Sequence, residues 1–311
     1  MLSGTSFAIV EVAGEAKAMQ IPRILAGLFA VSTLAVAAAQ ISKIDPTLLG
    51  KATAGDAQSQ YQVGMDYLMG KSVPMDDTQA AVWFQKAAEQ GHKQAEYQLG
   101  MLFHTGQGLP QDDAQAANWF RRAAVQGATE AQLALGELYD HGQGVPQDYP
   151  KAADWYSKAA LQGNDEAEFD LGTLNARGLG VPQDFTQAAY FYRKAAQQGN
   201  VEAEFNLGLL YDNGQGVTQD YKQAALWYGK AAEQGLARAQ FNLGSMYVSG
   251  QGVPQDSVEA YKWLFLSAEN WIGFRQEQAA RARDSVGARL TPAQLEDAKS
   301  RIAKWKAAHH Q

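Results

Sequence analysis

From Gly55 onward, the sequence repeats every 36 residues without an insertion or a deletion. One glycine column marks the period six times, at Gly64, Gly100, Gly136, Gly172, Gly208 and Gly244. An aromatic column keeps the same phase, at Trp83, Trp119, Trp155, Phe191, Trp227 and Trp263. Six units therefore occupy residues 55–270. A fixed period of this length is typical of a solenoid, in which each unit packs on its neighbours.

Each unit has the pattern of two helices. In the second unit, apolar residues at three-to-four spacing form one helical stripe, which consists of Ala95, Leu99, Leu102 and Phe103. The segment from Gly106 to Pro110 ends this helix, because glycine accepts the left-handed cap conformation and proline cannot continue a helix. Asp112 or Asp113 then begins a second helix, whose buried face carries Ala116, Ala117, Phe120, Ala123 and Ala124.

The first glycine column lies in the middle of the first helix, where glycine costs about 1 kcal/mol relative to alanine. We therefore expect the two helices of a unit to cross closely at Gly100 and its copies, with no room for a Cβ atom. The tryptophan column would fill the wider space beside this crossing and serve core packing. A bulky residue at Gly136 should then destabilise the fold through overpacking.

The pattern of the units resembles a known family. Residues Ala203 to Gly235 read A-x-x-x-L-G-x-x-Y-x-x-G-x-G-V-x-x-D-x-x-x-A-A-x-W-[FY]-x-K-A-A-x-Q-G. This is similar to the Sel-one-like repeat, a relative of the tetratricopeptide repeat. The resemblance implies an all-α fold, a right-handed α-solenoid of helix-turn-helix repeats. Departures from the pattern are local, at Ser72, Asn175 and Thr218.

After residue 270 the period ends, but the helical pattern continues. Thr291 to Gln294 has the sequence of a capping box, with proline at the first helical position. The final helix would bury Leu295, Ala298, Ile302 and Trp305, and would expose Glu296, Lys299, Arg301 and Lys304. Because a solenoid needs an end unit with a polar outer face, we predict C-terminal capping helices over residues 271–311.

The N-terminus carries a targeting pattern. An apolar stretch from Ile24 to Ala39 follows Arg23 and ends in three alanines. This pattern predicts a signal peptide over residues 1–39, cleaved after Ala39, with an uncleaved N-terminal anchor as the alternative and Met19 as a second possible start. Residues 40–54 would be a linker. The predicted location is therefore the periplasm or the exterior, or alternatively the inner membrane by way of the anchor.

Composition excludes several functions. The formal net charge is −7, which argues against nucleic acid as a partner. The absence of cysteine removes disulfides, thiolate metal sites and cysteine nucleophiles. Charge is also unevenly distributed, because residues 40–270 carry 16 basic and 27 acidic side chains, whereas residues 271–311 carry eight basic and four acidic ones.

No motif for catalysis, cofactor or metal binding is present. The five G-x-G turns follow helices and lack the third glycine of a dinucleotide site, so they are interpreted as helix caps. The histidines have no H-E-x-x-H spacing, and solvated side chains are expected at His92, His104 and His141. Carboxylates such as Glu166 and Glu168 point to different sides of a helix. There is no S-x-x-K motif. We therefore expect no catalytic residues, no cofactor and no metal ion.

The resemblance implies that the first helices line a concave face, where variable side chains bind a partner. Ten candidates occupy these columns: Glu130, Glu137, Asp140, Glu166, Asp170, Glu202, Asn206, Asp212, Arg238 and Asn242. The acidic members predict a groove for a basic or amide-rich segment, and the asparagines resemble those that hold a peptide backbone in tetratricopeptide grooves. The alternative is that these are ordinary solubilising charges.

These patterns predict a non-catalytic scaffold or adaptor of the bacterial cell envelope, which binds a partner protein or extended peptide on its concave face. A second hypothesis is a peptidoglycan-associated structural protein that binds glycan through exposed aromatics, namely Tyr61, Tyr97 and Trp271. A weak hydrolase is the third. Contact with a membrane is expected only through an uncleaved N-terminal segment, and the sequence does not define an oligomeric state.

Overall fold

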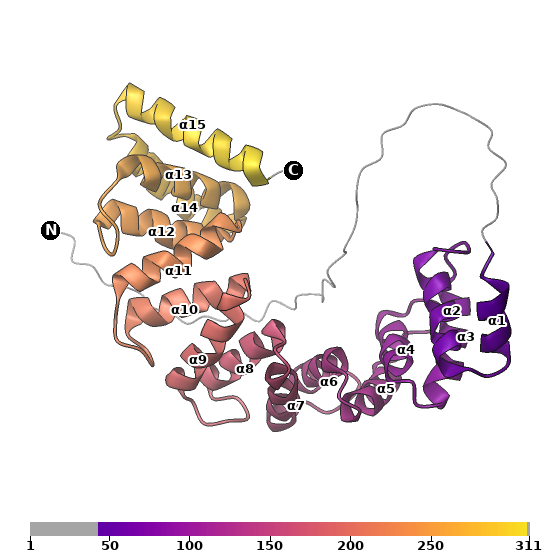
Figure 1. Ribbon diagram of the computed structural model, residues 1–311. Coiled ribbons are helices and arrows are strands. Elements are labelled where there is room, and N and C mark those ends of the chain that lie inside the picture. The colour runs from indigo at the N-terminus through magenta and orange to yellow at the C-terminus, as the bar shows by residue number, and fades with distance from the viewer. Residues whose placement is uncertain (1–42, 310–311) are drawn as a thin grey trace, which may run out of the picture. The chain divides into compact units, whose positions relative to one another are not determined.

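The structure, a computed structural model, describes residues 43–309, and helices make up nearly all of this region (Figure 1). The helices are α1 (Pro46–Thr53), α2 (Ala57–Met69), α3 (Asp77–Glu89), α4 (Lys93–Thr105), α5 (Asp113–Val125), α6 (Thr129–His141), α7 (Tyr149–Leu161), α8 (Asp165–Arg177), α9 (Phe185–Gln197), α10 (Val201–Asn213), α11 (Tyr221–Glu233), α12 (Ala237–Ser249), α13 (Ser257–Asn270), α14 (Gly273–Gly287) and α15 (Pro292–His309). No strand occurs in residues 43–309. The predicted signal peptide lies outside the described residues.

Helices α2 to α13 form six consecutive pairs, and each pair corresponds to one sequence unit (Figure 1). The first helix of a unit packs on the second, and the second packs on the first helix of the next unit. Each unit thereby buries apolar side chains both between its own two helices and against the neighbouring units. The all-helical solenoid expected from the sequence is confirmed.

Both ends of the helices are set by the residues that the pattern indicates. Asp112 rather than Asp113 is the N-cap residue of the second helix α5, because its carboxylate accepts hydrogen bonds from the backbone N–H groups of Ala114 and Gln115, both at 3.0 Å. The first helix α4 ends at Gly106, which adopts the left-handed conformation. The interpretation of the loop glycines as caps holds for this first glycine.

The second loop glycine has a different role. A Cβ atom at Gly144 would lie 2.1 Å from the carbonyl carbon of Asp113, at the start of the second helix of the preceding unit. This glycine therefore lets the loop of one unit approach the backbone of the unit before it. The first unit has Ser72 at this position, and no repeat precedes that unit.

The mid-helix glycines are required by aromatic rings. A Cβ atom at Gly136 would lie 2.6 Å from two carbon atoms of the Tyr156 ring, which projects from the second helix of the same unit. The expectation that no Cβ fits is confirmed, but the close neighbour is a side chain rather than the crossing backbone of α7. Tyr156 is the residue directly after Trp155, so the side chains that meet the glycines form a second column beside the tryptophan column. The column that meets the glycines consists of Phe84, Phe120, Tyr156, Tyr192, Tyr228 and Leu264.

The tryptophan column packs at the edge of the core. Trp83, Trp227 and Trp263 are buried, whereas Trp155 is half-buried and carries the ammonium of Lys158 3.9 Å from its ring centroid. Core packing was the expected role of this column, and the burial of these rings agrees with it.

A column of buried polar side chains, which sequence reasoning missed, links successive units. Glu96 accepts a hydrogen bond from the Gln126 side chain at 2.6 Å, 30 residues further on. Equivalent bonds join Glu168 to Gln198 and Glu204 to Gln234, both at 2.9 Å. The signal was available, because a glutamine precedes the glycine at the end of each of the first five units. Burial raises the pKa of Glu96, while the Arg122 guanidinium at 2.9 Å opposes this shift.

The two ends of the array are covered by further helices. The segment 40–54, expected to be a linker, contains α1, which packs on α2. At the other end, the capping box at Thr291 forms, since the Thr291 N–H donates to Gln294 at 3.0 Å and the Gln294 N–H donates back at 3.3 Å. Arg301, expected to point outward, instead binds Glu259 of α13 at 2.7 Å, which ties α15 to the last repeat.

Candidate partner-binding surface

The ten predicted partner-binding residues all lie on first helices, which are α6, α8, α10 and α12. The structure does not bring them together as one site. Four of them form a group that we call the acidic cluster, which consists of Glu137, Asp140, Glu166 and Asp170. Five others, on α10 and α12, form separate polar contacts. Glu130 is exposed at the start of α6.

The acidic cluster joins two successive units, because α6 and α8 are neighbouring first helices. Burial raises the pKa of Glu137 to about 7, and the negative charge of Glu166 adds to this effect. The pKa of Asp170 is raised well above its usual range, first by burial and then by the charges of Glu137 and Asp140. The carboxylates therefore share one region of negative potential. When they are ionised, their mutual repulsion destabilises the folded state.

The core residue Tyr156 contacts this cluster through its hydroxyl group. The hydroxyl group of Tyr156 donates to Oδ2 of Asp140 at 3.3 Å, while its ring packs against Gly136. Burial and the nearby carboxylates raise the pKa of this hydroxyl. The negative region also extends towards α4, where burial and the charges of Glu130 and Glu137 raise the pKa of Tyr97 to about 12. The packing that fixes each unit thus also positions the carboxylates.

These raised pKa values predict that the protein is more stable at pH 5 than at pH 8. The folded state binds more protons than the unfolded state between pH 4.5 and about 7, so the free energy of unfolding falls as the pH rises through this window. For Glu137 alone we expect about 1–3 kcal/mol. Urea unfolding at both pH values measures the difference. Glu137→Gln should reduce it, and an unchanged difference in this variant would contradict the assignment.

The polar residues on α10 and α12 do not extend the acidic groove. Arg238 forms an ion pair with Glu202, and its guanidinium lies 4.5 Å from the centroid of the Phe205 ring. The two charges compensate each other, so Glu202 adds little negative potential to the predicted acidic groove. Glu202 and Arg238 occupy the same column in adjacent units, and this spacing could have indicated their pairing.

The remaining three polar candidates are Asp212, Asn206 and Asn242, and two of them contact another core tyrosine, Tyr228. The Tyr228 hydroxyl donates to Oδ2 of Asp212 at 3.2 Å and also bonds to the Asn242 side chain. Asn206 is half-buried. The acidic cluster thus lies in the third and fourth units, while the fifth and sixth units present amides, the Glu202–Arg238 ion pair and the single carboxylate of Asp212.

Several other sequence expectations change with the structure. His104 is not solvated, because its side chain is only 12% exposed and its Nδ1 lies 2.7 Å from Asp113. The aromatics considered for glycan binding are half-buried in ring contacts, with Tyr61 centred 4.8 Å from the His92 ring and Trp271 centred 5.6 Å from the Phe241 ring. They do not form the exposed aromatic surface that the second hypothesis required.

Within residues 43–309, no group of three or more histidine, aspartate or glutamate side chains has a geometry that could hold a metal ion. No helix in the same part of the chain has both the length and the apolarity needed to cross a membrane.

Stacked helix pairs in which each unit packs on its neighbours define an α-solenoid. The Sel1 repeat family model matches six segments, residues 57–92, 93–127, 129–164, 165–200, 201–236 and 237–270. The chain therefore belongs to the Sel1 repeat family, whose members are generally non-catalytic scaffolds that mediate protein–protein interaction.

Solved structures agree with this assignment. A protective antigen of uropathogenic Escherichia coli strains, which displays an SLR fold, is 36% identical with a TM-score of 0.74, and the match covers 83% of this chain and 56% of that one. A Sel1 repeat protein from Oxalobacter formigenes is 30% identical with a TM-score of 0.61, covering 68% of this chain and 85% of that one. This chain thus spans little more than half of the Escherichia coli antigen. The comparison with curated proteins gave no match.

Proposed function

We propose that this protein is an adaptor of the bacterial cell envelope that holds a basic, extended segment of a partner protein on its acidic cluster. One observation carries the proposal. Four carboxylates lie together on α6 and α8, where burial raises the pKa of Glu137 and Asp170 and the neighbouring negative charges raise it further, and within residues 43–309 none of the four forms an ion pair with a lysine or an arginine.

The chemistry of the cluster favours a cationic ligand. Carboxylates that repel one another gain free energy when a positive charge is placed between them, because the bound cation replaces repulsion by attraction. Binding should therefore release protons and be stronger at pH 8 than at pH 5.5. The envelope part of the proposal depends on the apolar segment from Ile24 to Ala39, which precedes the described residues.

Neutralising the cluster tests this function. The triple variant Glu137→Gln, Glu166→Gln, Asp170→Asn should bind an extended decapeptide of alternating lysine and alanine at least 10-fold more weakly than the wild type, as measured by calorimetry at pH 8. It should not lose thermal stability, because the substitutions remove repulsion. Glu202 is left unchanged because Arg238 already pairs with it.

A matched control removes three exposed carboxylates elsewhere. The variant Glu89→Gln, Asp154→Asn, Glu277→Gln changes the net charge by the same amount but leaves the first helices untouched. We expect its affinity for the decapeptide to stay within twofold of the wild type. Equal losses in both triple variants would mean that net charge alone attracts the peptide, and the proposal would then fail.

A further inference from the structure

In two units, an arginine of the second helix is bound to a tyrosine of the next first helix. Nη2 of Arg121 in α5 donates to the Tyr139 hydroxyl at 2.9 Å. Nη2 of Arg193 in α9 donates to the Tyr211 hydroxyl at 3.0 Å. In both cases the two residues are 18 positions apart, so this contact is a recurring device of the repeat.

Between the fifth and sixth units the tyrosine is present, but a glycine stands at the position of the arginine. The corresponding residues are Gly229 in α11 and Tyr247 in α12. A Cβ atom at Gly229 would meet nothing within 4 Å, in contrast to Gly136. Glycine inside a helix costs about 1 kcal/mol relative to alanine, and here packing does not require it. Within residues 43–309, no arginine donates a hydrogen bond to the Tyr247 hydroxyl as one does to Tyr139 and Tyr211, and the nearby guanidinium of Arg301 is instead paired with Glu259.

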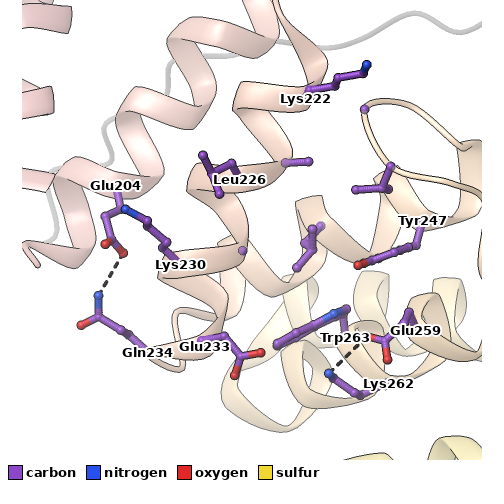
Figure 2. A pocket seen from close by; sticks show the side chains of 15 residues that line it. Glu204, Lys222, Leu226, Lys230, Glu233, Gln234, Tyr247, Glu259, Lys262 and Trp263 are labelled. Atoms are coloured by element: carbon purple, nitrogen blue, oxygen red, sulfur yellow. Dashed lines mark hydrogen bonds and ion pairs between the residues drawn. The ribbon is translucent and has the colours of Figure 1, made fainter. Parts of the chain in front are cut away.

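An open pocket of about 740 Å³ lies at this position between α11, α12 and α13 (Figure 2). Its walls include Leu226, Gly229, Leu243, Tyr247 and Val253, and the buried ring of Trp263 also lines it. The rim carries three glutamates and three lysines, so its formal charge is zero: Glu204, Glu233, Glu259, Lys222, Lys230 and Lys262. Lys262 is paired with Glu259 at 3.2 Å. Recognition in this pocket must therefore come from shape and hydrogen bonding rather than from net charge.

We propose that this pocket, here called the Gly229 pocket, binds an arginine side chain of a partner protein. The guanidinium takes the place that Arg193 occupies in the preceding unit and donates to the hydroxyl of Tyr247. The apolar walls at Leu226 and Leu243 cover the methylene groups of the bound side chain. Arginine is favoured over lysine because its planar group donates in a fixed geometry, as the two internal arginines do. This second site lies between α11, α12 and α13 and does not depend on the acidic cluster.

Small blocked amino acids test the pocket directly. We expect N-acetyl-L-arginine amide to shift the indole N–H signal of Trp263 in nitrogen–proton NMR spectra, with the signal assigned by Trp263→Phe. N-acetyl-L-lysine amide carries the same charge without the planar donor group, and it should bind at least 10-fold more weakly. Equal binding of the two compounds, or no shift with the arginine compound, would overturn the proposal.

Substitutions at Gly229 separate occupancy of the pocket from general effects. Gly229→Arg should supply the missing side chain, remain folded and lose at least 10-fold in affinity for the arginine compound. Gly229→Ala leaves the pocket open and should bind within twofold of the wild type. Tyr247→Phe removes one hydrogen bond and should weaken binding about fivefold. Wild-type affinity in Gly229→Arg would refute the assignment.

The acidic-cluster variant keeps the two proposals distinguishable. The triple variant Glu137→Gln, Glu166→Gln, Asp170→Asn should leave the arginine-induced shift of Trp263 unchanged. If this variant abolished the shift, the signal would report binding to the acidic cluster, and the Gly229 pocket would not be a site.

Discussion

Gly136→Ala is expected to lower the free energy of unfolding by about 2–3 kcal/mol, although alanine is the better helix former. The added Cβ atom would lie 2.6 Å from the Tyr156 ring, whose side chain is fully buried. The ring cannot move outward without leaving the core or disturbing its hydrogen bond to Asp140. Urea unfolding followed by circular dichroism measures the loss.

The same substitution at Gly229 provides the matched control. Gly229 also lies inside a helix, but a Cβ atom there has no neighbour within 4 Å. Helix propensity then acts alone, and Gly229→Ala should raise the free energy of unfolding by up to about 1 kcal/mol. Opposite signs for one substitution at two helical glycines would establish the packing role of Gly136. A gain at both positions would show that the Tyr156 ring yields easily.

The helical pairs could be predicted from the sequence because the period and the caps are local signals. The neighbour of the mid-helix glycine could not. Trp155 and Tyr156 are adjacent on α7, and one residue turns a helix by about 100°, so periodicity alone does not decide which ring faces Gly136. The structure places Tyr156 against the glycine and Trp155 at the edge of the core.

On the candidate surface, too, some contacts could be predicted from the repeat period, and others depend on how the helices are arranged in space. Residues of one column in adjacent units lie next to each other, so the pairing of Glu202 with Arg238 was implicit in their 36-residue separation. Glu137 and Asp170 belong to different columns, and only the arrangement of α6 and α8 brings their charges together. The Gly229 pocket likewise could not be predicted from local patterns, because residues of α11, α12 and α13 together line it. Its proposed ligand follows from comparison with two other units, in which an arginine occupies the position of Gly229.

Gly144→Ala is expected to have a larger effect than Gly136→Ala, because it acts between units rather than within one. Gly144 has a φ of +65°, which strains any other residue, and a Cβ atom there would lie 2.1 Å from the carbonyl carbon of Asp113. This neighbour is backbone at the start of α5, which cannot rotate away as a side chain can. We expect a loss of more than 3 kcal/mol through strain and displacement of the loop.

The consequence of this loss should be visible in cooperativity. A solenoid is held together by interfaces between neighbours, so a weakened interface lets the two flanking parts unfold separately. Urea unfolding of Gly144→Ala should therefore split into two transitions. Gly163→Ala is the control, because Gly163 has a φ of +84° but no atom within 4 Å of its Cβ position. It should cost only about 1–2 kcal/mol and keep a single transition. If both variants unfolded in one step with equal losses, backbone conformation alone would explain the second loop glycine, and the contact between units would carry no coupling.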